Sequence, residues 1–312
     1  MAKGEDTDDH HFIPQFYLRP WLSRNDRKLV EYGRVPPTME IRCRRWVTSK
    51  TGYVPNLYTL PGVTEETKQN VEKVFYQEVD TSAAKVRDKL LKREEMTDED
   101  LYIWARFLLS LGIRNPTEME KFKERLKRDF VKPDARLEAR WQEVRKDGQP
   151  ATVEEALLQL NPHTPEMAAI IISTKLAQNQ NVIRTLMGAD WMVYDATGAK
   201  RRFLTCDRPL IMTPLGRDDG QVAIPLSPDK LLTIFMKPKW NDELQYIPSD
   251  QVVEGVNRMI IAQAREKVYG VDNSYLEEVR EGMSSGEYFS LAMEPKPPAH
   301  PPTTNPSPPG VA

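Results

Sequence analysis

Four residues, far apart in a chain of 312, have side chains that could take part in catalysis: His11, Glu78, Arg114 and Asp207. A histidine titrates near neutral pH, so His11 could act as a general base, a general acid or a metal ligand. A carboxylate within an apolar helix stripe, as predicted for Glu78, could have a raised pKa and exchange protons. Asp207, at the end of an apolar strand, could bind a metal ion or orient a histidine. Arg114 could hold a carboxylate or a phosphate through two hydrogen bonds.

Each of these residues also has a purely structural interpretation. His11 lies just before a short helix that Pro14 favours, and it could cap that helix. Glu78 could be exposed or paired with a buried arginine. Arg114 ends an apolar helix, where the helix dipole favours a cation. Asp207 could accept backbone N–H groups within a turn. The residues themselves leave both interpretations open.

Hydrophobic periodicity predicts an α+β protein in which a central helical block packs with an N-terminal and a C-terminal β region. The helix starts at Thr64 and Thr97 are marked by acidic first turns, and Pro116 predicts the end of the second helix. Residues 191–194 and 201–205 flank a Thr-Gly pair and predict a hairpin. The expected regions are strands in 28–60, helices in 64–188, strands in 191–236 and a helix over 249–266.

The organisation along the chain is simple. We expect residues 1–9 to be disordered because they are polar and acidic. Residues 10–293 form a single α+β domain in this interpretation, since no flexible linker divides them. Residues 294–312 are rich in proline and predict a disordered tail, because proline removes backbone donors and fixes φ.

Composition excludes several classes of protein. The net charge is -2, which argues against a protein that coats nucleic acid or a membrane surface. No apolar run approaches the roughly 20 residues of a membrane span, so no membrane partner is expected. Two cysteines and the absence of an apolar leader favour a reducing cytoplasm. With only four histidines a histidine-rich metal site is excluded. The common phosphate-loop, dinucleotide, zinc-protease and esterase motifs are absent.

A series of sequence blocks resembles a bacterial family that is defined by a domain of unknown function. The blocks are a His-x-x-Pro-x-x-Tyr-Leu motif at residues 11–18, a mid-helix glutamate, an Arg-x-Pro helix end at Arg114, Trp191 on a strand, and a Thr-x-Asp-x-Pro turn around Asp207. The resemblance covers roughly residues 8–265. Cys206 departs from it, since a serine is expected there. The resemblance carries no activity, but it implies that His11, Glu78, Arg114 and Asp207 are the positions of interest.

If these four residues share one pocket, hydrolysis of a phosphoester or of nucleic acid is the first hypothesis. Asp207 and Glu78 would then hold a divalent cation such as Mg²⁺ or Mn²⁺, and His11 would activate water. Arg114 would stabilise the charge that develops on the phosphoryl group. This hypothesis predicts that His11 and Asp207 meet in the fold, and it makes a phosphate-containing ligand or nucleic acid the expected partner.

The alternative is a non-enzymatic binding or regulatory module in which the same residues form a structural network. The two hypotheses differ in the surroundings of the carboxylates. A structural network saturates them with protein donors, whereas a catalytic site leaves oxygens facing an open cleft. Three arginines on a predicted strand, Arg42, Arg44 and Arg45, give a separate, weak indication of phosphate binding.

Overall fold

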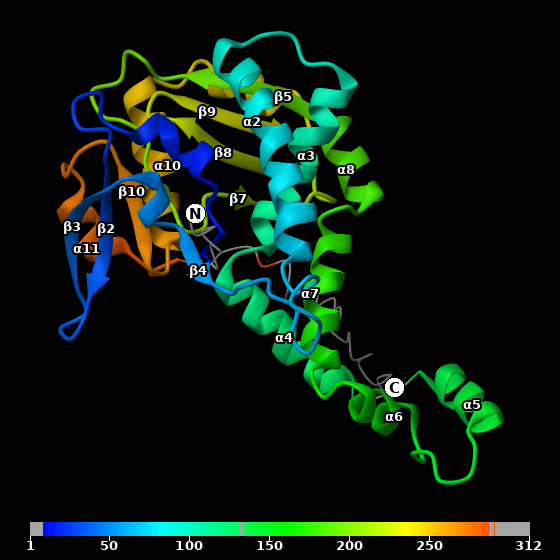
Figure 1. Cartoon of the computed structure of the whole chain (residues 1–312). Helices are drawn as coiled ribbons and strands as arrows, with labels where there is room; N and C mark the ends of the chain where they lie inside the picture. The colour runs from blue at the N-terminus through cyan, green and yellow to red at the C-terminus, as the bar shows by residue number, and fades with distance from the viewer. Residues whose placement is uncertain (1–8, 131–133, 287–289, 291–312) are drawn as a thin grey trace, which may run out of the picture.

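The computed structural model describes residues 9–130, 134–286 and 290 (Figure 1). Helices and three antiparallel sheets make up the described chain, which confirms the α+β prediction. The terminal segments predicted to be disordered lie outside the described residues, except for Asp9, which begins strand β1 (Asp9–His11).

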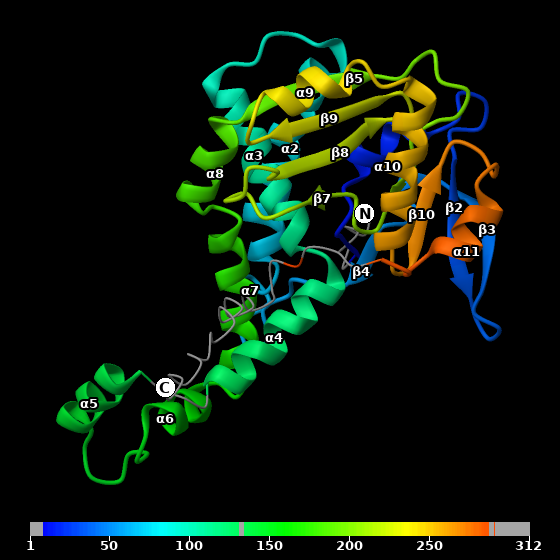
Figure 2. The same cartoon turned by 180° about the vertical axis from the view of Figure 1, so that it is seen from behind.

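One sheet joins the N-terminal and C-terminal β regions. Its strand order is β3 (Glu40–Trp46), β2 (Leu29–Val35), β10 (Lys267–Gly270) and β6 (Thr205–Cys206). One of its faces is covered by α10 (Ser249–Gln263) and α11 (Leu276–Gly282), with which it forms a hydrophobic core (Figure 2). Segments more than 200 residues apart therefore pair directly, and the chain cannot be cut between its two β regions without breaking this sheet.

The second four-stranded sheet corrects the predicted hairpin. Its order is β5 (Asp190–Asp195), β9 (Lys230–Phe235), β8 (Gln221–Ser227) and β7 (Ile211–Met212), so β5 pairs with β9 and not with residues 201–205. The stretch after the Thr-Gly turn is held elsewhere: the Phe203 carbonyl accepts from Trp21 Nε1, and the Leu204 amide donates to Asn257 Oδ1. These long-range bonds outweigh the local turn signal. Helix α9 (Lys239–Leu244) follows β9.

The helical block packs against this second sheet. It includes α2 (Gln77–Lys92), α3 (Asp98–Ile113) and α8 (Gln180–Met187), whose buried side chains share one core with β8 and β9. A capping box between Thr97 and Asp100 starts α3, and α3 ends before Pro116, both as predicted. The segment from Thr64 does not form an α-helix at once, because a π-helical turn, η3 (Val71–Tyr76), precedes α2.

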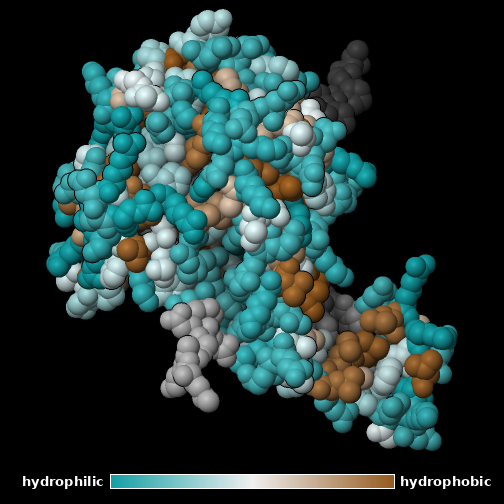
Figure 3. All heavy atoms as spheres, turned by 45° about the horizontal axis from the view of Figure 1, so that its top comes forward, coloured by the Kyte–Doolittle hydropathy of each residue, from teal (hydrophilic) through white to brown (hydrophobic). Residues whose placement is uncertain are grey.

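A helical arm projects from this body. Helices α4 (Pro116–Phe130) and α7 (Thr164–Leu176) run side by side and carry α5 (Ala135–Val144) and α6 (Val153–Leu160) at the tip (Figures 1 and 2). Hydrophobic surface gathers on that tip in Figure 3, where Leu137, Val144 and Leu160 are exposed. Among the described residues, no helix has the length and apolar character needed to cross a membrane.

The opening motif, which is the His-x-x-Pro-x-x-Tyr-Leu block at residues 11–18, connects the two β regions. Strand β1 pairs with β4 (Tyr53–Pro55), and the chain then enters α1 (Gln15–Leu18) and the short helix η1 (Arg19–Trp21). Most of the apolar side chains of this motif are buried. The Tyr17 hydroxyl donates to the Pro225 carbonyl and also bonds the Thr205 hydroxyl, each at 2.8 Å. The His-x-x-Pro-x-x-Tyr-Leu and Thr-x-Asp-x-Pro blocks therefore meet at Tyr17, together with strand β8.

Candidate functional site

An open cleft of about 1140 Å³ lies beside the opening motif. Its walls come from β1, the start of α1, the short helix η2 (Thr48–Lys50), η3 and α2. These elements are widely separated in sequence. The pairing of β1 with β4 holds the first wall, and the packing of α2 against α3 holds the opposite one.

Three polar side chains on one face of η3 and α2 lie at this cleft or directly behind it. Glu72, Tyr76 and Asp80 follow one another at intervals of four residues, which places them on the same side of a helix. Glu72 and Asp80 line the cleft, whereas Tyr76 is buried. The helix therefore presents two carboxylates to the cleft with a buried phenol between them.

Arg114 lies behind this face, at the C-terminal cap of α3. Its Nη1 donates to Asp80 Oδ1 at 2.8 Å, and its side chain is fully buried. The guanidinium carbon lies 5.6 Å from the centre of the Tyr76 ring. The Nε and Nη2 atoms have no hydrogen-bond partner among the described residues. Arg114 is thus a buried cation that Asp80 satisfies at only one of its three nitrogens.

The two carboxylates have raised pKa values. Burial raises the pKa of Glu72 to about 7, although Arg114 partly opposes this effect. Burial also raises the pKa of Asp80, again against the attraction of Arg114. Glu72 Oε2 is buried and has no hydrogen-bond partner among the described residues. Near neutral pH Glu72 is therefore divided between the acid that can donate a proton and the base that can accept one.

His11 faces the same cleft with an unpaired ring nitrogen. Its Nε2 atom has no hydrogen-bond partner in the described part of the chain, and burial lowers the pKa of its ring. His11 is therefore neutral near pH 7, the form in which an imidazole accepts a proton. The predicted role as a general base is compatible with this environment but is not tested by it.

The neighbouring His10 is held more tightly. Its Nδ1 accepts the Tyr58 amide at 2.9 Å, so its Nε2 carries the proton and donates to Gln69 Oε1 at 2.7 Å. The Tyr58 ring stacks on His10, and the Tyr58 hydroxyl donates to the Arg114 carbonyl. His10 thereby links β1 to the end of α3 and fixes the floor of the cleft.

Asp207 lies in a different environment. Its carboxylate accepts hydrogen bonds from two backbone amides: the Arg265 amide is shared between both oxygens at 3.1 and 3.3 Å, and the Glu266 amide donates to Oδ2 at 3.0 Å. Burial raises the pKa of Asp207 to about 6, while the amide bonds oppose this rise. Asn115 Nδ2 donates to the Asp207 carbonyl at 2.8 Å, so the Arg-x-Pro and Thr-x-Asp-x-Pro blocks meet here. This turn ties the start of α4 to α10 and β10.

Glu78 also lies outside the cleft. It forms an ion pair with Arg106 at 2.7 Å, and half of its side chain is exposed. Among the described residues, no hydrogen bond, ion pair or ring contact joins His11 to Asp207. Over all the residues that the structure describes, no group of three or more histidine, cysteine, aspartate or glutamate side chains could hold a metal ion. The structure thus places His11 at the cleft and the buried Arg114 behind it, while Glu78 and Asp207 lie elsewhere.

Sequence reasoning missed the two carboxylates that line the cleft. The block around Tyr76 was recognised, but Glu78 was selected from it in place of Asp80. The available signal was the four-residue spacing of Glu72, Tyr76 and Asp80, which marks a polar strip beside the apolar stripe of the helix. His10 was missed because only its neighbour belongs to the recognised motif.

A family model described as a protein of unknown function, DUF4238, matches residues 9–274. The chain therefore belongs to this family. No curated protein and no solved structure matches it.

Proposed function

Because the family to which the chain belongs has no established function, we propose from the geometry of the cleft that this protein hydrolyses phosphoesters, including those of nucleic acids. The observation that carries the proposal is a pair of buried atoms without a partner among the described residues, His11 Nε2 and Glu72 Oε2, in two residues that line one open cleft. Burial lowers the pKa of His11 and raises the pKa of Glu72 to about 7. At neutral pH the cleft therefore offers both a proton acceptor and a proton donor.

Three cations line the cleft beside three carboxylates, Asp9, Glu72 and Asp80. Arg19, Lys50 and Lys73 line the cleft, and none of them forms a side-chain hydrogen bond or an ion pair with another described residue. A phosphate group that entered the cleft would meet these cations first. These cations favour phosphoesters as the substrate class, including those of nucleic acids.

In the proposed reaction, His11 and Glu72 each transfer one proton. His11 Nε2 takes a proton from water as the water oxygen attacks phosphorus. The ester P–O bond breaks, and Glu72 donates its proton to the departing oxygen. Solvent then restores both groups. Arg114, held by Asp80, is a positioning residue, because its charge acts on the pKa values of His11 and Glu72.

The divalent cation inferred from the sequence does not fit the residues proposed for it. The Asp207 carboxylate is occupied by two backbone amides, and Glu78 is paired with Arg106. Neither residue lines the cleft. The surroundings of Asp207 and Glu78 thus do not support a site for Mg²⁺ or Mn²⁺ there, and activity measured with and without these ions tests this conclusion.

The test compares two glutamates of the same helical segment. Hydrolysis of bis(p-nitrophenyl) phosphate and of a labelled oligonucleotide would be followed for Glu72→Gln and for the matched control Glu78→Gln, with and without Mg²⁺ and Mn²⁺. We expect Glu72→Gln to remove the alkaline decline of kcat/KM near pH 7, and His11→Ala to lower kcat/KM by roughly 100-fold or more. Glu78→Gln and Asp207→Asn should leave kcat/KM unchanged.

Three outcomes would contradict the proposal. A folded Glu72→Gln variant with the full wild-type activity and pH profile would remove Glu72 from the mechanism. A loss of activity confined to Glu78→Gln and Asp207→Asn, together with strict dependence on a divalent cation, would favour the metal arrangement inferred from the sequence. Wild-type protein without activity under any of these conditions would reject hydrolysis of these substrates.

The non-enzymatic module is the second candidate, and the saturated carboxylate of Asp207 favours it. The bonds of Tyr17 to Thr205 and Pro225 likewise show motif residues that connect segments of the chain. If this second candidate is correct, substitutions at His11 and Asp207 should both lower thermal stability, and neither should change turnover of any phosphoester.

A further inference from the structure

A second site lies on the sheet β3–β2–β10, outside the cleft. Successive side chains of a strand point to opposite faces, so Arg42, Arg44 and Trp46 share one face of β3. The other face, which carries Ile41 and Cys43, is covered by the core that contains α10 and α11. The face with the two arginines remains open, and a pocket of about 260 Å³ is formed there.

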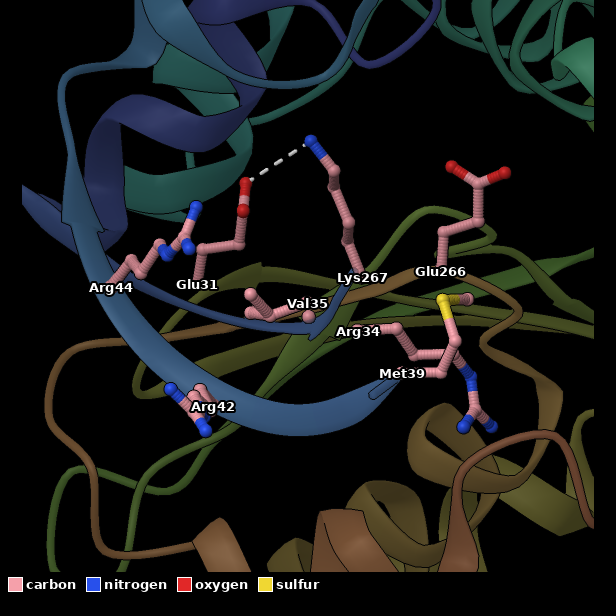
Figure 4. A pocket seen from close by; sticks show the side chains of 9 residues that line it. Glu31, Arg34, Val35, Met39, Arg42, Arg44, Glu266 and Lys267 are labelled. Carbon is pink, nitrogen blue, oxygen red and sulfur yellow. Dashed lines mark ion pairs between the residues drawn. The ribbon is translucent and has the colours of Figure 1, made fainter. Parts of the chain in front are cut away.

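The pairing of the strands fixes which residues meet across this face. Gly33 of β2 lies opposite Arg42 on one side and opposite Lys267 of β10 on the other. Because Gly33 has no side chain, the backbone between these two cations is uncovered. Figure 4 shows Arg44, Glu31 and Lys267 extending on the same side of the sheet. Cations from two strands thus flank the space over Gly33, which the Glu31 carboxylate also borders.

Two carboxylates also line the pocket, and their effect is limited. Glu31 is buried and already bound, because Lys267 Nζ lies 3.3 Å from its Oε2 and the Thr51 hydroxyl donates to the same oxygen. Glu266 is exposed on the β10 side of the pocket. Three cationic side chains on this face, Arg42, Arg44 and Lys267, accompany these two carboxylates, and Arg34 lines the pocket from the opposite face of β2.

The arginines are available to a ligand. Neither Arg44 nor Arg34 forms a side-chain hydrogen bond or an ion pair with any described residue. Arg42 pairs only with Glu40, and both side chains are more than half exposed. Such a surface pair is worth about 1 kcal/mol or less, so a phosphate can displace it.

An edge strand often carries charged residues that prevent pairing with another chain, and β3 is an edge strand. That role does not require a cation on β10 or an uncovered glycine between the cations. It also does not account for Trp46, which is partly exposed and belongs to neither hydrophobic core among the described residues. An aromatic ring beside two arginines is the combination with which proteins hold single strands, since the ring stacks on a base.

We propose that this face, defined by Arg42, Arg44, Trp46 and Lys267, binds single-stranded nucleic acid. Arg42 and Arg44 lie two residues apart, about 7 Å along the strand, so each can contact a different phosphate. Trp46 stacks on a base at the end of the row, and Gly33 lets the backbone of the ligand approach the sheet. The inference concerns binding and does not depend on the chemistry of the cleft.

The experiment measures the binding of short fluorescent single-stranded RNA and DNA by anisotropy over a range of salt concentrations, with the integrity of the probe checked on a gel. We expect Arg42→Ala/Arg44→Ala to weaken binding about tenfold or more. The slope of log Kd against log salt should fall by about 0.7 for each phosphate that the double variant no longer binds. Trp46→Ala should weaken binding roughly tenfold, whereas Trp46→Phe retains a ring and should have a smaller effect. The matched control is Arg45→Ala, because Arg45 lies on the same strand but is held by Asp26.

Substitutions at Gly33 compare a charged side chain with an uncharged one of the same size. A Cβ at Gly33 would lie 3.6 Å from the Glu266 carbonyl oxygen and from Glu31 Oε1, which is ordinary contact, so a side chain can begin there without a clash. Gly33→Glu should abolish binding, while Gly33→Gln should weaken it far less. Unchanged catalysis on a small phosphodiester in these variants is expected, and it separates this site from the cleft.

Four results would overturn the proposal. The first is that the wild-type chain does not bind, and the second is that Arg45→Ala weakens binding as much as the double variant does. The third is that Gly33→Gln and Gly33→Glu weaken binding equally. The fourth is that polyglutamate competes for the site as effectively as unlabelled RNA. The last result would assign the face to acidic peptides.

Discussion

The open cleft and the Asp207 turn both contain buried polar groups that include carboxylates, but they differ in how many hydrogen-bond partners the protein supplies. At the turn, backbone amides of Arg265 and Glu266 donate to both oxygens of one carboxylate. At the cleft, His11, Glu72 and Arg114 keep atoms without a partner among the described residues. Buried polar atoms are normally paired, so unpaired ones that gather beside an open cleft require an explanation.

Burial and pKa alone do not separate the two regions. Burial raises the pKa of Glu72 to about 7 and that of Asp207 to about 6. Perturbed pKa values mark functional sites only probabilistically, because structural networks shift them as well. The difference lies in access: Glu72 lines a cleft, whereas Asp207 is enclosed by the backbone that it bonds. In this protein, the number of hydrogen-bond partners that surround a carboxylate is therefore a better guide to its role than its pKa.

The largest expected effect concerns the ion pair behind the cleft. Asp80→Ala leaves the fully buried Arg114 without the carboxylate that pairs with it, and removal of one partner from a buried pair costs about 3–5 kcal/mol. The matched control is Glu78→Ala on the same helix, whose half-exposed pair with Arg106 should contribute about 1 kcal/mol or less. Urea denaturation measures both. Equal destabilisation of the two variants would show that Arg114 is not held by Asp80.

A smaller effect is expected at the Asp207 turn. Asp207→Asn keeps the size of the side chain but presents an NH₂ group to amides that also donate. One donor is then left unsatisfied, which costs about 1–3 kcal/mol. Thermal or urea denaturation measures the destabilisation, and phosphoester turnover by the folded fraction should not change. A variant as stable as wild type, but inactive, would reverse the assignment of the two regions.

Features that depend on local signals could be predicted from sequence. The start of α3 at its capping box and its end before Pro116 follow from Thr97, Asp100 and the proline alone. The α+β class follows from periodicity. The burial of Tyr17 and Trp21 follows from their apolar character, but the hydroxyl bond from Tyr17 to Thr205, 188 residues away, does not.

The rest depends on contacts that a local pattern does not encode. Thr197 and Gly198 favour a turn, yet β5 pairs with β9 because β9 offers a matching register over six residues. Glu78 and Asp80 are equally acidic and two positions apart. Only the position of Arg114, 34 residues beyond Asp80, decides which of them is buried in an ion pair. His11 and Arg114 thus stay predicted site residues that the sequence could single out, whereas Glu72 and Asp80 become candidates only from the fold.

The last expected effect is a difference in pH dependence that isolates Glu72. Burial raises the pKa of Glu72 from its ordinary value to about 7, so the folded state binds more protons than the unfolded state between about pH 4.5 and pH 7. The free energy of unfolding should therefore decrease as pH rises through this window. Glu72→Gln carries no charge and should remove this contribution, while that of Asp207 is present in both proteins and cancels in their difference. Urea midpoints for both proteins across the window test this expectation. Parallel curves would mean that Glu72 titrates normally, and the cleft would then lack its proton donor at neutral pH.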